Sequence, residues 1–248
     1  MTGPLVGESG GPPHILDVGT GSGVLALGAR RRWPGAMVTG VDPSVGMLAV
    51  AAQRAVASGV DADDRSLTWL VAPADALPLP DVSVDLVISS FVLQLVPDRA
   101  AALQELRRVL RPGGRLAAIT WLDGAHEFLP ATEFDEAVID LGMPDPDDEE
   151  DDGRSGDFSS PRAAADELRR AGFERVSARP DTLTHVWTPG TYWAFKRHYD
   201  EAWLFETLEG TPHLERLETL IRDRFAALPA DAFTWQAPVV SLVAPRPA

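Results

Sequence analysis

The sequence contains no cysteine among its 248 residues, which excludes disulfide bonds, thiolate nucleophiles and zinc sites built on thiolates. No apolar run approaches the roughly 20 residues that a membrane-spanning helix needs, so no membrane span is expected. Residues 1–13 have neither a basic start nor an apolar stretch of the kind seen in secretory signals, and we expect them to form a flexible lead. We therefore expect a soluble, cytoplasmic protein.

Basic residues are scarce, because 22 Lys and Arg stand against 37 Asp and Glu, giving a formal net charge of −15. Such a chain repels nucleic-acid phosphates, so we expect a small-molecule ligand and no nucleic acid. Seven of the acids lie between Asp145 and Asp152. This run predicts a solvated loop and not a metal site, because Glu150 and Ser159 stand where a calcium loop needs other residue types.

Short apolar runs alternate with segments of helical periodicity from His14 to Ile119, which is typical of a parallel sheet with crossover helices. Helices are expected at 23–33, 44–58 and 98–110, the second with Ser44 as its N-cap. The apolar runs predict five parallel strands, at 14–18, 37–41, 67–71, 84–90 and 115–121.

The second half of the chain predicts further helices and two more strands. A helix is expected over 130–141, and another starts at a Ser160 cap and closes at Gly172. A strand should begin near Phe173 or Glu174, two helices should fill 189–228, and a last strand should cover 236–243. The whole predicts an α/β fold: a mostly parallel seven-stranded sheet with an antiparallel last strand. Residues 14–248 would form one domain, with helical insertions at about 123–160 and 188–230 acting as a substrate lid.

The segment HILDVGTGSG places three alternate glycines, Gly19, Gly21 and Gly23, between the first strand and its helix. Glycines allow the tight turn and close approach to a ligand that such a junction requires. The spacing differs from the G-x-G-x-x-G of dinucleotide enzymes, and Asp17 lies just before the turn. A carboxylate there disfavours a pyrophosphate and suits the ammonium or sulfonium of S-adenosylmethionine (SAM).

Two more acids follow strand ends. Asp42 ends the second strand, where a carboxylate can accept hydrogen bonds from both ribose hydroxyls, and Pro43 and Met47 could offer an apolar face to adenine. Asp75 could accept from the adenine amino group, with the N–H of Ala76 reaching a ring nitrogen. At the end of the fourth strand, Ser90 and Phe91 should border the transferred methyl.

Four segments in this order, HILDVGTGSG, GVDPSVGML, PADALPLPDVSVDLVISSFVLQLV and LRRVLRPGGRLAAITW, give the chain a family resemblance. It resembles the class I SAM-dependent methyltransferases of Rossmann-like fold, in particular the ubiquinone and menaquinone biosynthesis group (methyltransferase type 11), over about 15–121. The resemblance implies SAM as cofactor and S-adenosylhomocysteine as product. It implies a cofactor site made of Asp17, Gly19, Thr20, Gly21, Gly23, Asp42, Pro43, Met47, Ala74, Asp75, Ala76, Ser90 and Phe91.

The chain departs from this family at two places. Relatives usually carry one or two helices before the glycine motif, whereas about fourteen residues precede it here. The later insertions could cover the acceptor site, the pocket could be more open, the true start could lie upstream, or a second copy in a homodimer could supply the cover. Gln94 stands where quinone enzymes often carry a histidine, so no catalytic role is assigned to it.

These residues predict methyl transfer to O, N or C of a small apolar or aromatic metabolite by in-line displacement. If a general base assists, His126 is the best placed candidate, just beyond the fifth strand. The aromatics Tyr192, Phe195, Tyr199 and Trp203 have helical spacing and predict either a lid or ordinary core packing. Two alternatives remain: a SAM-binding protein with a regulatory or non-methylating role, and an NAD-dependent reductase.

Overall fold

The computed structural model describes residues 11–61, 64–124, 127–143 and 153–247. The chain forms two compact units. Unit 1 comprises Met1–Asp123, Gly153–Asp181 and Val239–Ala248, and unit 2 comprises Gly124–Asp152 and Thr182–Pro238. His126 and the acidic run from Asp145 to Asp152 lie outside the described residues.

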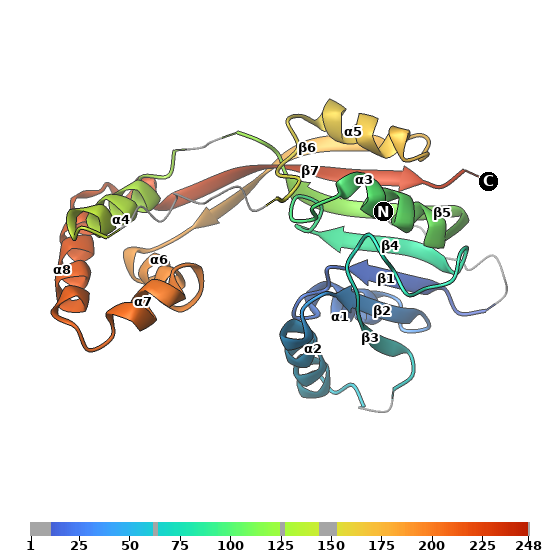
Figure 1. Ribbon diagram of the computed structural model, residues 1–248, viewed down its shortest axis with the longest axis horizontal. Helices are drawn as coiled ribbons and strands as arrows, with labels where there is room; N and C mark the ends of the chain where they lie inside the picture. The colour runs from blue at the N-terminus through green and yellow to red at the C-terminus, as the bar shows by residue number, and fades with distance from the viewer. Residues whose placement is uncertain (1–10, 62–63, 125–126, 144–152, 248) are drawn as a thin grey trace. The chain divides into compact units, whose positions relative to one another are not determined.

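Unit 1 is built on a seven-stranded sheet in the order β3-β2-β1-β4-β5-β7-β6 (Figure 1). Strands β1 to β5 pair in parallel, and β7 pairs antiparallel with β5. This confirms the predicted mostly parallel sheet with its antiparallel last strand. The strands are β1 (His14–Val18), β2 (Met37–Asp42), β3 (Leu67–Val71), β4 (Val84–Ser90), β5 (Leu110–Trp121), β6 (Ser177–Val186) and β7 (Thr234–Pro245).

Helices cover both faces of this sheet because successive residues of a strand point to opposite sides. Ile15 of β1 packs in a cluster with Ala26, whereas the next residue, Leu16, packs in a cluster with Leu103 and Leu168. One face therefore carries α1 (Val24–Arg32) and the other carries α3 (Arg99–Val109) and α5 (Pro161–Arg170). The remaining helix of unit 1, α2 (Val45–Ala57), follows β2.

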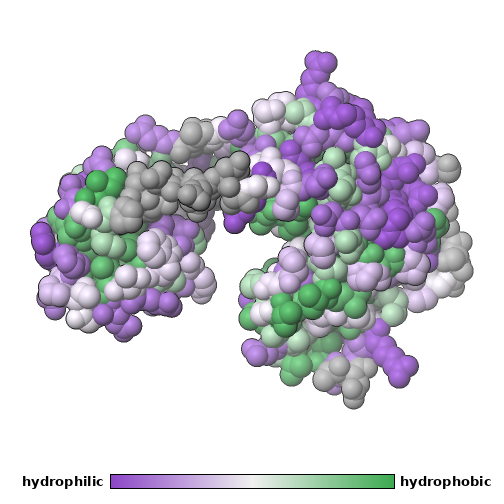
Figure 2. All heavy atoms as spheres, in the orientation of Figure 1, coloured by the Kyte–Doolittle hydropathy of each residue, from purple (hydrophilic) through white to green (hydrophobic). Residues whose placement is uncertain are grey.

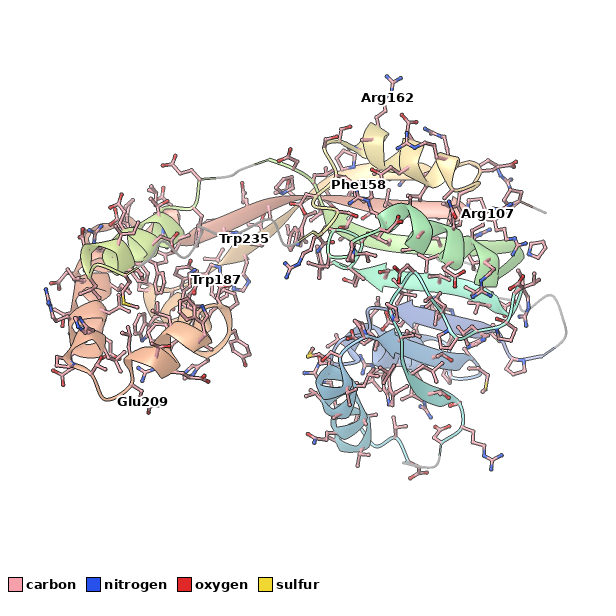
Figure 3. The ribbon with its side chains drawn as sticks, viewed as in Figure 1. Arg107, Phe158, Arg162, Trp187, Glu209 and Trp235 are labelled. Atoms are coloured by element: carbon pink, nitrogen blue, oxygen red, sulfur yellow. The ribbon has the colours of Figure 1, made fainter. Side chains whose placement is uncertain are left out.

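Polar caps set where these helices begin. The hydroxyl of Ser44 accepts from the Met47 N–H at 3.2 Å, and that of Ser160 accepts from the Ala163 N–H at 3.1 Å, as predicted. Asp98 caps α3 in the same way, through the Ala101 N–H at 2.8 Å. After α5, Gly172 adopts φ +90°, and a Cβ there would lie 2.7 Å from Nε of Arg107 (Figure 3). Only glycine suits that position.

Two strand boundaries differ from the prediction. β5 begins at Leu110 and not at Arg115, because Leu110 already pairs with Val84 and an irregularity in register lets Pro112, Gly113 and Gly114 pass within the strand. β6 begins at Ser177, and not at Phe173 or Glu174. Phe173 is instead buried in the core beside α5. Phe173 is thus apolar because it packs in the core, and it does not begin a strand.

Unit 2 has its own core of aromatic and aliphatic side chains, which includes Phe134, Tyr192, Phe205 and Phe225. Trp187, labelled in Figure 3, lies at its edge with ring centroids 5.6 Å from Tyr192 and 5.1 Å from Phe195. The helical elements are α4 (Leu129–Asp140), α6 (Pro189–Phe195), the π-helix η1 (Lys196–Asp200), α7 (Ala202–Leu208), α8 (Pro212–Ala227) and the 3₁₀ turn η2 (Ala230–Phe233).

The prediction of two helices over 189–228 is wrong for the first of them, which is broken by the π-helix. Lys196 is buried there, with its Nζ 2.7 Å from an oxygen of Asp200 and 4.7 Å from the ring centre of Phe134. The wider turn changes the register of the aromatic stripe. Tyr192 is therefore buried, while Tyr199 is 78% exposed and Trp203 is 53% exposed.

Candidate functional site

The strand order reverses between β1 and β4, and ligands of open α/β sheets bind at the carboxyl ends of the strands beside such a reversal. A pocket of about 560 Å³ lies at this position, entirely within unit 1. Its volume is within the range of small-molecule sites. It is lined by Gly19, Gly21, Asp42, Pro43, Met47, Ala72, Pro73, Ala74, Asp75, Ser90, Phe91, Val92, Leu95, Val96 and Pro97.

The glycine turn forms one wall. Gly19, Gly21 and Gly23 have φ values of +67°, +51° and +78°, in the left-handed region that favours glycine. A Cβ on Gly19 would lie 2.2 Å from a methyl carbon of Val92, so the turn also needs the missing side chain for space. The turn is tied to the second strand by the Thr20 N–H, which donates to the Val41 carbonyl at 2.9 Å.

Asp42 holds two turns together with one carboxylate. Its Oδ2 accepts from the Gly21 N–H at 2.8 Å, and its Oδ1 accepts from the Ser44 N–H at 2.9 Å. Each oxygen has a further lone pair for a ligand hydroxyl. This bridging role was not foreseen from the sequence, although the pairing of strands β1 and β2 implies that their ends meet.

Asp17 lies beneath the glycine turn and is almost fully buried, so it does not itself line the pocket. Burial raises the pKa of the Asp17 carboxyl to about 6, with a smaller upward contribution from the charge of Asp42. Hydrogen bonds from the Thr20 hydroxyl, at 2.7 Å, and from the Ala26 N–H oppose that rise in pKa. Asp17 therefore supports the glycine turn from its buried side, through its hydrogen bond with Thr20.

The opposite wall begins where β4 ends. Phe91 has φ +56°, an uncommon conformation for a residue with a side chain, and its N–H donates to the Ile119 carbonyl at 2.8 Å. Its ring stacks on Trp121 with centroids 4.2 Å apart. The sequence interpretation stopped at Phe91 and missed the apolar residues after it, Leu95, Val96 and Pro97, which also line the pocket.

The third wall follows β3. Asp75 and Ala74 line the pocket as expected, but Ala76 does not, and its N–H donates to the Pro73 carbonyl at 3.3 Å. Gly23 and Thr20 likewise support the turn without lining the pocket. Met47 contributes from the first turns of α2, over which hydrophobic residues gather in Figure 2. Among them Val45, Met47 and Val50 are exposed.

The charge of this pocket separates the candidate ligands. Asp42 and Asp75 line it, and no Lys or Arg is among the described residues of its lining. A pyrophosphate would therefore meet carboxylates and no cation, whereas a positively charged nucleoside with free hydroxyl and amino groups suits this set of acceptors. The arrangement favours SAM over NAD.

Gln94 occupies a structural position. It is buried, its Oε1 accepts from the Thr120 hydroxyl at 2.5 Å, and its carbonyl accepts from the Gly156 N–H at 3.0 Å. The side chain thus holds β5 against the segment after β4. Among the described residues no group of acids and histidines is arranged to hold a metal ion.

The sequences of known proteins show which family this chain belongs to. A model of a methyltransferase domain matches residues 16–118. A ubiquinone/menaquinone biosynthesis C-methyltransferase of Desulfotalea psychrophila is 32% identical over 201 residues, which cover 77% of this chain and 78% of that protein. The chain belongs to the class I SAM-dependent methyltransferases. Ubiquinone/menaquinone C-methyltransferases are among the relatives that it matches, as the sequence resemblance indicated.

Other relatives of this methyltransferase match over a shorter stretch. The demethylmenaquinone methyltransferase of Thermus thermophilus is 44% identical over 108 residues, and the match spans 44% of this chain and about half (47%) of that protein. Identity above 40% thus extends over less than half of this chain.

Solved structures agree on the fold of the methyltransferase. The YcgJ protein of Bacillus subtilis superposes with a TM-score of 0.58 at 20% identity, covering 97% of this chain and 94% of that one. A phosphoethanolamine N-methyltransferase of Haemonchus contortus, in complex with S-adenosylhomocysteine, gives 0.58 at 20% identity, covering 98% and 50%. SAM is the cofactor of this family, and the acceptors of the pocket fit it. No described helix of the methyltransferase is long and apolar enough to cross a bilayer.

Proposed function

We propose that this methyltransferase transfers the methyl group of SAM to O, N or C of a small apolar or aromatic metabolite. The observation that carries the proposal is the pocket beside β1 and β4, which presents two carboxylates, an apolar wall and no cation among its described lining residues. A sulfonium nucleoside is the ligand class that such a pocket suits.

Each wall has a role in this proposal. Asp42 accepts from the ribose hydroxyls, Asp75 accepts from the adenine amino group, and Met47 packs on the adenine face. The glycine turn, supported by Asp17, holds the methionine part. Support comes from the geometry already formed in the protein, because Asp42 is fixed by two backbone N–H groups and needs no rearrangement to accept a ligand.

The transfer breaks the bond between methyl carbon and sulfur and forms one between that carbon and the acceptor. SAM supplies the electrophilic methyl, and the positive charge on sulfur disappears in the step. Phe91, Leu95 and Val96 provide an apolar border that would keep water from competing with the acceptor. An acceptor hydroxyl or amine also loses a proton, and His126 remains our candidate base for it.

The class of acceptor rests on two observations. Two of the sequence relatives are named as methyltransferases of menaquinone and ubiquinone biosynthesis, and the net charge of −15 disfavours nucleic acid. Unit 2 contains an aromatic core, and we propose that it contributes to acceptor binding as a lid. A cytoplasmic location and a homodimer remain predictions. Light scattering tests the homodimer.

The proposed transfer is tested by turnover. The purified chain is incubated with SAM and a panel of hydroxylated, aminated and quinol aromatics, and release of S-adenosylhomocysteine is measured. Release that depends on one acceptor and is lost in Asp42→Ala supports transfer. Tight SAM binding without acceptor-dependent release over a broad panel would favour a non-methylating role. Fluorescence of the unit 2 tryptophans that ignores both SAM and acceptor would contradict the lid.

A further inference from the structure

A second pocket of about 560 Å³ lies wholly within unit 2, and none of the residues assigned to the cofactor is part of its lining. One side comes from α6 and the start of η1, through Trp193 and Arg197. The other side comes from α8, where Glu218, Ile221, Arg222 and Phe225 follow one another at intervals of three, one and three residues and so share a helix face. We call this pocket the α6–α8 groove.

The floor of the α6–α8 groove is apolar and partly aromatic. Phe225 is buried, with its ring centroid 5.8 Å from that of Tyr192, and Ile221 is buried beside it in the core of unit 2. Trp193 is half-buried, with its ring set edge-on to Phe205 at 5.1 Å. Trp193, Ile221 and Phe225 all pack in the core of unit 2, so the floor offers apolar and aromatic side chains on which the ring of a ligand can pack.

The charges at the rim are not balanced. Arg197 is paired with Glu218, with Nη1 and Oε1 2.7 Å apart. Arg222 is exposed, and within the described part of the chain its guanidinium makes no ion pair or hydrogen bond. With Glu218 already neutralised, the groove carries a net positive charge in a protein whose overall charge is −15. The guanidinium of Arg222 suits a carboxylate, because it can donate two parallel N–H hydrogen bonds to the two carboxylate oxygens.

Gly190 is part of the lining of the groove on the α6 side. A Cβ at this position would meet no atom within 4 Å, and its φ lies outside the left-handed region. Neither backbone conformation nor packing therefore demands glycine there. A side chain at 190 would extend into free space beside the groove.

We propose that the α6–α8 groove is a binding site for a small planar aromatic carboxylate, separate from the cofactor pocket. The ring lies on Trp193, Ile221 and Phe225, and the carboxylate pairs with Arg222. Such a ligand suits both parts of the groove. Its ring covers the apolar floor, and its carboxylate pairs with the guanidinium of Arg222. A neutral ring would use only the floor, and a cation would be repelled by Arg222.

The test uses the full chain and 2-naphthoate as probe, with 2-naphthylmethanol as the uncharged analogue, by isothermal titration calorimetry. Arg222→Ala should weaken naphthoate binding about tenfold or more, and leave 2-naphthylmethanol unchanged, because only the charge-assisted bonds are lost. Arg216→Ala is the matched control, since Arg216 is exposed on the same helix and does not line the groove. Binding in this control should equal that of the unaltered chain.

A second variant tests the groove itself. Gly190→Leu adds a side chain at a position that lines the groove and should weaken binding of both probes, while leaving the melting temperature unchanged or raised, because leucine favours a helix over glycine. Saturation with S-adenosylhomocysteine should leave naphthoate binding intact. The proposal is overturned if naphthoate binds no more tightly than 2-naphthylmethanol, if Arg222→Ala binds it normally, or if S-adenosylhomocysteine displaces it. None of these outcomes depends on methyl transfer.

Discussion

Asp42 is the residue on which the cofactor pocket depends most, because its two oxygens join the β1–α1 and β2–α2 turns. Asp42→Asn keeps the shape of the side chain but replaces one acceptor by an NH₂ group, which faces either the Gly21 or the Ser44 N–H. We expect SAM binding to weaken about tenfold or more, since a backbone N–H of one turn loses its acceptor and a ribose acceptor is lost. Calorimetric titration measures the loss. Asp61→Asn, at an exposed side chain of unit 1, should bind as the unaltered chain does.

Asp17 should make stability depend on pH. Its folded-state pKa of about 6 lies above the ordinary 3.8, so between these values the unfolded chain ionises while the folded chain keeps its proton. Stability from this group is full below about pH 4 and falls as pH rises to about 6, by about 3 kcal/mol. Asp17→Asn cannot ionise. Urea unfolding should therefore show that the free energy of unfolding of Asp17→Asn rises relative to that of the unaltered chain between pH 4 and 6. Above pH 6 the difference between the two free energies should be constant. Parallel curves would show that Asp17 does not titrate there.

At the scale of elements, the turn after β1 packs closely against the segment after β4 at Gly19, where there is no room for a side chain. Gly19→Ala puts a methyl against Val92 in a left-handed conformation, and we expect a loss of about 2 kcal/mol or more with weakened SAM binding. Val92→Ala in the same chain should restore the part due to space and not the part due to φ. A double-mutant cycle by urea unfolding measures this coupling. Gly46→Ala, whose Cβ meets only Oγ of Ser44 at 3.8 Å, is the control.

The segment after β4 is also held from α5. Arg99 makes two bonds to Glu167, at 2.8 and 3.0 Å, donates to the Gly156 carbonyl at 2.6 Å, and lies 3.9 Å above the centre of the Phe158 ring. Arg99→Met should leave the Glu167 carboxylate unpaired and loosen the segment from Gly153 onward. Hydrogen exchange should quicken at the Ser155 and Gly156 amides, which donate to the Val96 and Gln94 carbonyls. Arg170→Met, at an exposed side chain of α5, should leave both rates unaltered.

Elements could be predicted where local rules decide them. The caps Ser44 and Ser160 and the periodicity of α3 are local, and their positions agree with the sequence to within a residue or two. The π-helix at Lys196 could not be predicted, because it depends on a buried cation finding Asp200 and the Phe134 ring, and Phe134 comes from α4, far away in the chain. The early start of β5 depends likewise on pairing with Val84.

At the scale of the whole molecule, the sequence predicts the sheet, several helices and most of the cofactor pocket, but neither the π-helix nor the groove of unit 2. Strand ends that carry Asp42, Asp75 and Phe91 meet in one pocket because a parallel sheet brings its carboxyl ends to one edge. Four predicted residues are exceptions that do not line the pocket: Asp17, Thr20, Gly23 and Ala76. Leu95 to Pro97 carry no motif, so only the tertiary structure reveals their role. Unit 2 was expected as two insertions, and its α6–α8 groove has no sequence signature at all.

The central claim is that the pocket beside β1 and β4 accepts a sulfonium nucleoside. Calorimetric titration of the unaltered chain with SAM, and separately with NAD, tests it most directly. We predict one SAM bound per chain with a rise in melting temperature, and no measurable heat with NAD. A chain that takes up NAD, or that shows neither heat nor a changed melting temperature at saturating SAM, would contradict the account.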